Sequence, residues 1–242
     1  MSCAVTCVRG GSMLSERSLR SITRVALSLL GEDGFALAGS GAIREHRLIS
    51  RETVDIDLFN DSMRLDAPAH PFRYYVDKLA QGLADAGMRV DEAQIRGDYA
   101  RLCLHTDEGK VEVDLGFDYR EFAPVDLSIG PVLDIRDAVG NKVCAVYSRG
   151  EIRDYIDLDS IRLKSEFSDD DFIALARERD AGFDDERFAE ALSFASRIPK
   201  QRVAAYGLTE NDLMLMQKRT LDWARSLCKG GHRNRHGLGR SV

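Results

Sequence analysis

The chain has 242 residues, of which 44% are hydrophobic and 31% are charged, and its formal net charge is −6. This composition is ordinary for a globular protein, and the length is sufficient for two lobes with a sizeable core. No apolar run approaches the length of a membrane span, and residues 1–11 are too short and polar for a secretory signal. The five cysteines are scattered and odd in number, which favours free thiols in a reducing compartment. A membrane protein and a disulfide-stabilised secreted domain are therefore excluded, and a cytoplasmic protein is expected.

Taken in chain order, the first dozen residues are expected to be disordered, with Met13 as an alternative start. Residues 15–30 have the apolar spacing of an amphipathic helix, and residues 35–38 form an apolar run typical of a strand. The chain then breaks at Gly39-Ser40-Gly41 before a helix-compatible stretch at 42–48. The remaining predicted elements are a strand at 54–59, a helix at 72–86, strands at 88–95, 99–106 and 110–117, and helices from 134 to 227.

The turn at Gly39-Ser40 is the first candidate for a binding site. It offers unpaired backbone N–H groups and the positive end of a helix dipole, which suit a phosphate. Fourteen residues further on, residues 54–59 alternate strictly, so that Asp55 and Asp57 share one face of a strand. Two adjacent carboxylates repel each other unless a cation neutralises them, and their hard oxygens suit Mg²⁺. Together the two motifs predict a site for a nucleoside triphosphate (NTP) and its metal.

A third carboxylate is expected from the strand at 110–117, where the same alternation puts Glu112 and Asp114 on one face. Asp114 is the preferred metal ligand because it leads into Gly116 at the strand end, and Glu112 stays open as the alternative. Taken singly, an acidic alternating strand is often the solvated face of an antiparallel sheet, and Gly-Ser before a helix is often a simple cap. The occurrence of both motifs in this order favours a site.

Residues 134–150 predict a helix that ends at glycine. Its valines form an apolar stripe, which leaves the ammonium of Lys142 free to reach a triphosphate. Arg149 is a second candidate for a phosphate or nucleic-acid contact. The alternative is that such arginines complement the helix dipole, and that Arg153 and Asp157 form a surface i, i+4 ion pair.

Three segments resemble the AbiEii/AbiGii and MenT group of nucleotidyltransferase toxins. They are Gly39-Ser40 with Asp55-Ile56-Asp57, then Asn141-Lys142-Val143 continuing to Arg149, and finally Asp154-Tyr155-Ile156-Asp157-Leu158. The resemblance extends over residues 31–165. The chain departs from the family pattern in a longer gap before Asp55 and in six residues, not three or four, between Lys142 and Arg149.

This resemblance implies an α+β fold, with a DNA polymerase β-like nucleotidyltransferase domain built on a mixed sheet and a helical C-terminal lobe. It implies transfer of a nucleoside monophosphate from an NTP to the 3′ end of tRNA, a block of translation, and a cognate antitoxin encoded by a neighbouring gene. It also gives Asp157 a catalytic role near Lys142. The residues expected to act are Asp55, Asp57, Lys142 and Asp157 in catalysis, Gly39, Ser40, Lys142 and Arg149 in nucleotide binding, and Asp55, Asp57 and Asp114 in metal binding.

The expected domain division is a leader at 1–12, a nucleotidyltransferase domain at 13–130, a helical lobe at 131–229 and a disordered basic tail at 230–242. Residues 218–242 carry seven Lys and Arg against Asp222 alone, a net charge of +6 that leaves −12 for the rest of the chain. Such an arm suits an RNA backbone, although a solvated tail would have the same composition.

Two other functions stay open. A small-molecule nucleotidyltransferase of the antibiotic-modifying type shares the Gly-Ser and Asp-x-Asp motifs, but the segments around Lys142 and Asp157 count against it. A non-catalytic nucleotide-binding protein is disfavoured by the intact carboxylate pair. The spacing of Cys228, His232 and His236 resembles a zinc site, but a tight structural site needs a fourth ligand.

Overall fold

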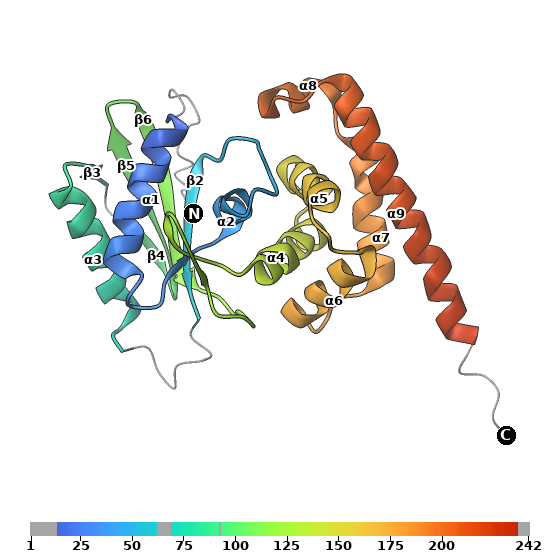
Figure 1. Cartoon of the computed structure of the whole chain (residues 1–242), viewed down its shortest axis with the longest axis horizontal. Helices are drawn as coiled ribbons and strands as arrows, with labels where there is room; N and C mark the ends of the chain where they lie inside the picture. The colour runs from blue at the N-terminus through green and yellow to red at the C-terminus, as the bar shows by residue number, and fades with distance from the viewer. Residues whose placement is uncertain (1–13, 62–68, 92, 237–242) are drawn as a thin grey trace, which may run out of the picture. The chain divides into compact units, whose positions relative to one another are not determined.

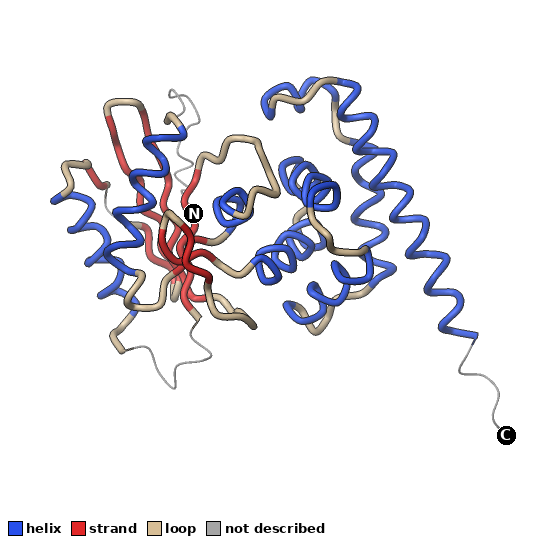
Figure 2. Tube along the Cα trace, viewed as in Figure 1, coloured by secondary structure: helices blue, strands red, loops and turns tan. Residues whose placement is uncertain are grey.

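The structure is a computed structural model that describes residues 14–61, 69–91 and 93–236, apart from the side chains of 230–236. The chain forms two compact units, neither of which is continuous in sequence. The sheet unit comprises Met1–Leu37, Val54–Asp118 and Ser128–Pro131, and the helical unit comprises Ala38–Thr53, Tyr119–Leu127 and Val132–Val242. Figure 1 labels the elements, and Figure 2 shows that strands dominate the first unit and helices the second.

The sheet is mixed, as the sequence predicts. Its strands are β1 (Ala36–Leu37), β2 (Asp55–Asn60), β3 (Arg89–Val90), β4 (Gln94–Arg96), β5 (Tyr99–Thr106), β6 (Gly109–Phe117), β7 (Val125–Leu127) and β8 (Gly130–Val132). Among the described residues they follow the order β3-β5-β6-β2-β1-β8-β7, with β4 also paired to β5. β2 and β6 run parallel, whereas β1–β2 and β5–β6 are antiparallel. The short strands β7 and β8 were not predicted from the sequence.

One face of this sheet is apolar and packs on two helices. α1 (Glu16–Leu30) begins at the N-cap Ser15, whose hydroxyl accepts from the Ser18 N–H, and α3 (Phe72–Asp85) follows the same face (Figure 1). The apolar side chains of the central strands are fully buried: Ile56, Leu58, Leu102, Leu104, Val113 and Leu115 are each at most 1% exposed. Because the side chains of a strand alternate, the polar residues between them lie on the opposite face.

The helical unit is built around α4 (Ile135–Ser148). This helix contacts α2 (Gly39–Glu45), α5 (Ile152–Lys164), α6 (Asp169–Arg179) and α7 (Asp185–Ser193). The predicted valine stripe of α4 is buried in these contacts. The unit is completed by η1 (Phe194–Arg197), α8 (Lys200–Val203), η2 (Ala204–Tyr206) and α9 (Glu210–His236).

The division into units differs from the contiguous one expected from the sequence. Residues 38–53 belong to the helical unit because α2 packs against α4, although they lie between two strands of the sheet in sequence. The prediction of a disordered tail from residue 230 is wrong for 230–236, because α9 continues through Gly230-Gly231 to His236. The expected leader and residues 237–242 lie outside the described part of the chain. No helix within the described residues is long and apolar enough to cross a membrane.

Candidate active site

Four carboxylates lie on the polar face of the sheet unit. In the parallel pair β2–β6, Asp55 is opposite Glu112 and Asp57 is opposite Asp114. Residues opposite each other in a ladder point to the same face, and the intervening Ile56 is buried on the other. The structure therefore brings together the two aspartates of β2 and both sequence candidates for the third carboxylate.

Arg101 of β5 fixes the carboxylate of Asp114. Its Nε and a terminal nitrogen donate to the two Asp114 oxygens, each at 2.7 Å, and another terminal nitrogen lies 3.2 Å from Glu112. These hydrogen bonds to Asp114 raise the pKa of Arg101 above its ordinary value. Burial, followed by a hydrogen bond to Asp114, raises the pKa of Tyr99 to about 12. Asp114 is thus oriented by Arg101 in the position opposite Asp57, which is the more buried of the two candidate positions for a third ligand.

The donor set fits a divalent cation. Carboxylate oxygens from neighbouring strands are the hard ligands that Mg²⁺ takes alongside water and substrate phosphates. Both oxygens of Asp114 already accept from Arg101, but each carboxylate oxygen has a second lone pair to share with a metal. Asp55 and Asp57 of β2 and Asp114 of β6 are therefore candidate ligands, and Arg101 orients Asp114.

A second constellation, in the helical unit, is a buried charge network centred on Asp157 of α5. Asp157 is fully buried and accepts two hydrogen bonds from Arg51, at 2.6 and 2.7 Å. Its Oδ2 also accepts from the Ser40 hydroxyl at 3.1 Å and lies 3.0 Å from Lys142 Nζ. The Ser40 oxygen in turn accepts from Arg51 at 2.8 Å. The segment that contains Ser40 and Arg51 is thereby joined to α4 and α5, which lie far from it in sequence.

The network extends through Lys142 to a second buried carboxylate, Asp154. Lys142 donates to Asp154 at 3.1 Å, and Arg149 donates to both Asp154 oxygens at 2.9 and 3.0 Å. The backbone N–H of Glu151 donates to the same carboxylate at 3.2 Å. Asp154 and Asp157 lie one turn apart on α5 and therefore share a face, on which Lys142 contacts both.

Both aspartates stay ionised despite their burial. Burial alone raises the pKa of Asp154, but the hydrogen bonds from Arg149 and the charge of Lys142 outweigh it and bring the pKa to about 2. Burial likewise raises the pKa of Asp157, and the hydrogen bonds from Arg51 with the Lys142 charge lower it below its ordinary value. A buried carboxylate remains charged only where cations pair with it, and these cations meet that condition.

Two interpretations of α4 and α5 change accordingly. The alternative of a surface ion pair between Arg153 and Asp157 is wrong, because Asp157 is buried and Arg153 pairs with Glu151 at 2.9 Å. The ammonium of Lys142 does not project freely from its helix, because it is buried and contacts two aspartates. Of the network, sequence reasoning missed Arg51 entirely and gave Asp154 no role.

The Gly39-Ser40 turn opens α2 directly. Gly39 has φ 56°, a left-handed conformation that favours glycine, and it is the first residue of the helix. Ala38 precedes it and provides no side-chain cap to the first N–H groups. The Ser40 hydroxyl contacts Asp157 and Arg51, so a phosphate at this turn would have to bind to backbone N–H groups.

An α+β fold with paired carboxylates on adjacent strands of a mixed sheet is the arrangement of nucleotidyltransferases of the DNA polymerase β type. Residues 25–228 match the family described as "Nucleotidyl transferase AbiEii toxin, Type IV TA system", where TA denotes toxin–antitoxin. The chain belongs to this family, and the resemblance predicted from the motifs is confirmed. Membership makes the chain a nucleotidyltransferase with an NTP substrate, and it implies a partner antitoxin.

Two solved structures from Helicobacter pylori are similar to the chain. A provisionally assigned nucleotidyltransferase has a TM-score of 0.55 and 17% identity, with 94% of this chain and 100% of that chain covered. The protein JHP933 has a TM-score of 0.49 and 17% identity, with 93% and 97% covered. The first of these likenesses supports the fold. No curated protein matches the chain.

Proposed function

We propose that this toxin transfers a nucleoside monophosphate from an NTP to the 3′ end of tRNA, with Mg²⁺ as its metal, and thereby blocks translation. The observation that carries the proposal is the in-register set of carboxylates on β2 and β6. It supplies the ligands that nucleotidyl transfer requires, on a face that α1 and α3 leave uncovered within the sheet unit.

Asp55 and Asp57 are the proposed ligands of Mg²⁺, with Asp114 as the third. A bound Mg²⁺ neutralises charge on the attacking and leaving oxygens. Arg101 supports the role of Asp114 as a ligand, because its two hydrogen bonds fix the direction of the Asp114 oxygens. Removal of Arg101 would leave Asp114 free to rotate away from Asp57.

For the triphosphate, the proposed ligands are the backbone of Gly39 and Ser40, together with Lys142 and Arg149. The buried charge network supports this assignment, because Arg51 and Lys142 contact the same Asp157 carboxylate that accepts from Ser40. The Arg149 side chain is half exposed, so a phosphate can reach it. Asp157 is fully buried, and its proposed catalytic role is to position Ser40, Arg51 and Lys142.

An RNA acceptor is supported by the basic C-terminal segment. Within α9, Arg219 pairs with Asp159 and Arg225 pairs with Asp222, while Lys218 and Lys229 are exposed. The sequence adds Arg233, Arg235 and Arg240 beyond them. A row of cations on an otherwise acidic chain favours a polyanion over a small neutral acceptor.

The test is incubation of the purified protein with each labelled NTP, total tRNA and Mg²⁺. We expect label at the tRNA 3′ end with one NTP preferred, and none in the Asp57→Asn variant. Label on an aminoglycoside, with tRNA unmodified, would replace this proposal by the small-molecule alternative. Co-expression of the neighbouring gene should relieve growth arrest if it encodes the antitoxin.

A further inference from the structure

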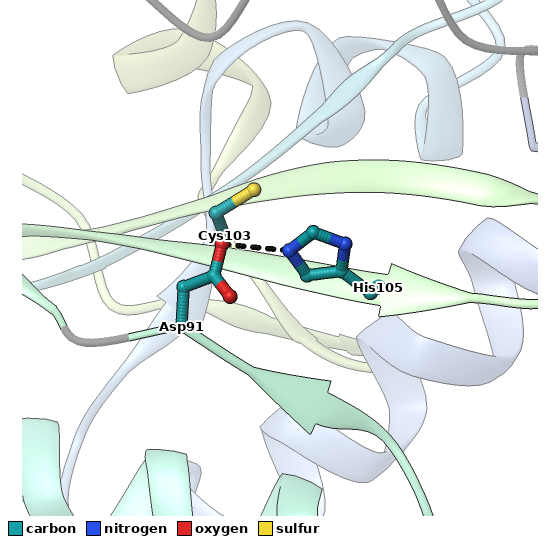
Figure 3. A group of neighbouring side chains, drawn as sticks. All are labelled: Asp91, Cys103 and His105. Atoms are coloured by element: carbon teal, nitrogen blue, oxygen red, sulfur yellow. Dashed lines mark hydrogen bonds and ion pairs between the residues drawn. The ribbon is translucent and has the colours of Figure 1, made fainter. Parts of the chain in front are cut away.

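A group of three side chains of different chemistry lies on the sheet unit, at the edge formed by β3 and β5. Asp91 directly follows β3, and Cys103 and His105 are alternate residues of β5 that share a face. One ligand atom from each lies within 4.8 Å of the other two (Figure 3). Carboxylate, thiolate and imidazole together are a typical ligand set for Zn²⁺ and poorly suited to Mg²⁺.

The backbone holds these residues together. Arg89 is opposite His105 and Val90 opposite Leu104, and the Asp91 N–H donates to the Cys103 carbonyl at 3.0 Å. The register then shifts by one residue before β4, where Gln94 is opposite Arg101. The contacts of β3 and Asp91 with β5 place Asp91 beside Cys103 at the end of β3.

The hydrogen bonds of His105 define its tautomer. Nε2 lies 2.6 Å from an Asp91 oxygen, the contact drawn in Figure 3, and Nδ1 lies 2.9 Å from a terminal nitrogen of Arg89. Arginine can only donate and a carboxylate can only accept, so Nδ1 is the acceptor and Nε2 carries the proton. A metal bound at Nε2 would leave the imidazole proton on Nδ1, and the exposed Arg89 side chain would then turn away because two donors cannot pair.

We propose that Asp91, Cys103 and His105 bind Zn²⁺ or a similar borderline-soft divalent metal, with a fourth position open to water. Tetrahedral zinc bonds place neighbouring ligand atoms about 3.3–3.7 Å apart. The present separations, from 2.6 Å for Asp91–His105 up to 4.8 Å at most, lie on both sides of that range. Asp91 is half exposed and has room to adjust its side chain.

The bound metal would fasten an edge strand that is otherwise weakly held. β3 pairs with β5 through two residues only, within the described part of the chain. A metal that joins Asp91 to two residues of β5 adds a bond across this pairing, in a place where a short strand frays easily. The site requires neither nucleotide nor RNA, so it is independent of the proposed function.

Cobalt is the probe for the test, because a thiolate bound to Co²⁺ gives a near-ultraviolet charge-transfer band. The full chain, freed of metal by chelation, is titrated with Co²⁺ and then with Zn²⁺ as competitor. We expect one equivalent of Co²⁺ to produce the band and Zn²⁺ to abolish it. Cys103→Ser should lose the band, and His105→Ala should weaken Co²⁺ binding at least tenfold.

Matched variants separate this site from the other candidates. Cys228→Ser removes the thiol that precedes His232 and His236 in the sequence, Cys144→Ser removes another cysteine thiol, and Asp57→Asn alters the carboxylate face. All three should keep the band. A band that survives in Cys103→Ser, or that disappears in Cys228→Ser, overturns the proposal.

A second measurement uses the unaltered chain. Alkylation by a maleimide, followed by peptide mass analysis, should show Cys103 protected by Zn²⁺ and the exposed Cys228 equally reactive with and without it. Equal labelling of Cys103 in both conditions would contradict the proposal even if a variant failed to fold.

Discussion

At the residue scale, the guanidinium of Arg101 contacts two of the four carboxylates on the polar face of the sheet. Arg101 is bidentate on Asp114 and reaches Glu112, so two of the four carboxylates are partly neutralised. Asp55 and Asp57 lie opposite Glu112 and Asp114 in the ladder. A cation bound among these four carboxylates would reduce the repulsion between the two strands. Under the proposed function, β2 would provide Asp55 and Asp57 as metal ligands, and β6 would provide Asp114, which Arg101 positions.

Replacement of Asp57 by Asn should reduce nucleotidyl transfer by at least about a hundredfold, because loss of a metal ligand removes several kcal/mol of charge stabilisation. The fold should persist, since Asp57 lies on the polar face. Transfer rates and far-ultraviolet circular dichroism check both points. The matched control is Asp107→Asn, an exposed aspartate in the β5–β6 turn, which should keep full activity.

The same carboxylates predict a stabilisation by metal. Mg²⁺ should raise the unfolding temperature of the wild-type protein, because it binds the folded state and relieves repulsion between Asp55 and Asp57. The increase should be smaller in Asp57→Asn and should vanish with chelation. An equal increase in the variant would indicate that Mg²⁺ binds elsewhere.

Lys142 was predicted to reach freely towards a triphosphate, whereas in the structure its ammonium is buried. Its ammonium lies between Asp154 and Asp157, so Lys142→Met would leave two buried carboxylates with one cation fewer each. Removal of one partner from a buried ion pair costs about 3–5 kcal/mol. Lys142→Arg should not restore full stability, because a planar guanidinium directs its donors differently in the same space.

The measurement for Lys142 is urea unfolding followed by Trp223 fluorescence. Trp223 is the single tryptophan, it is buried, and it lies against Phe172 and Phe188 in the helical unit. An unfolding midpoint equal to wild type in Lys142→Met would show that the ammonium is not part of the network. A raised KM for NTP in a folded Lys142→Arg protein would support its phosphate contact.

At the scale of elements, the buried charge network joins α2, α4, α5 and the residues after α2. Ser40 comes from α2, Lys142 from α4, and Asp154 with Asp157 from α5. Capping contributes as well, because the Glu151 and Asp154 side chains form a capping box at the start of α5. The Asp154 side chain therefore caps the start of α5 and also pairs with the buried Lys142.

Stability of the helical unit should fall in acid through Asp154. Its folded pKa of about 2 is lower than the ordinary value of 3.8, so the ionised form is favoured by folding. The stability is present above pH 3.8 and is lost as pH falls towards 2, and the shift corresponds to about 2 kcal/mol. Trp223 fluorescence in urea at pH 7 to 2 measures it.

The Asp154→Asn variant should be less stable than wild type at pH 7, and the difference should shrink as pH falls from 3.8 towards 2. The control is Glu190→Gln, an exposed carboxylate on α7 in the same unit, which should remain within about 0.5 kcal/mol of wild type. A constant difference between Asp154→Asn and wild type across this range would contradict the account.

Local patterns predicted the elements that depend on alternation or helical spacing. The strand at 99–106 and the helices near 15–30 and 72–86 were predicted almost residue by residue, because each has a regular apolar face. The strand at 110–117 was expected to be a neighbour of the strand at 54–59, and β6 does pair with β2, but the parallel register was not predictable because it is set by tertiary packing. Arg51 lies in a segment without periodicity, and only the folded chain brings it to Asp157.

The end of α9 shows the limit of compositional reasoning. Gly230-Gly231 and the dense positive charge predict disorder, yet the helix continues to His236. Glycine lowers helix stability by about 1 kcal/mol per residue without forbidding the helix. Upstream, Leu213, Met216 and Trp223 are buried, which anchors the helix before it reaches the glycines.

At the scale of the whole molecule, the unequal distribution of charge is the main feature. The segment at 218–242 carries +6 and the rest −12, so a polyanion is attracted to one part of the chain and repelled by the remainder. If the attracted polyanion is tRNA, as the proposed function requires, expression without the antitoxin should arrest growth, and tRNA from arrested cells should carry added 3′ nucleotides. Continued growth with unmodified tRNA ends would contradict this.

The contribution of the C-terminal cations is measurable through salt. Replacement of Arg233, Arg235 and Arg240 by alanine keeps the length of the chain and removes three positive charges. If these side chains contact tRNA phosphates, affinity should fall and the slope of log affinity against log salt should decrease by up to about 2, since each contact contributes about 0.7 for single strands. A control with equal charge change replaces Arg17, Arg20 and Arg24, which line one surface pocket of about 380 Å³ on α1. If both triple variants lose affinity and slope equally, net charge alone governs RNA binding. A loss confined to the first would locate the RNA contact at the C-terminal segment, because only the position of the charges differs between the two.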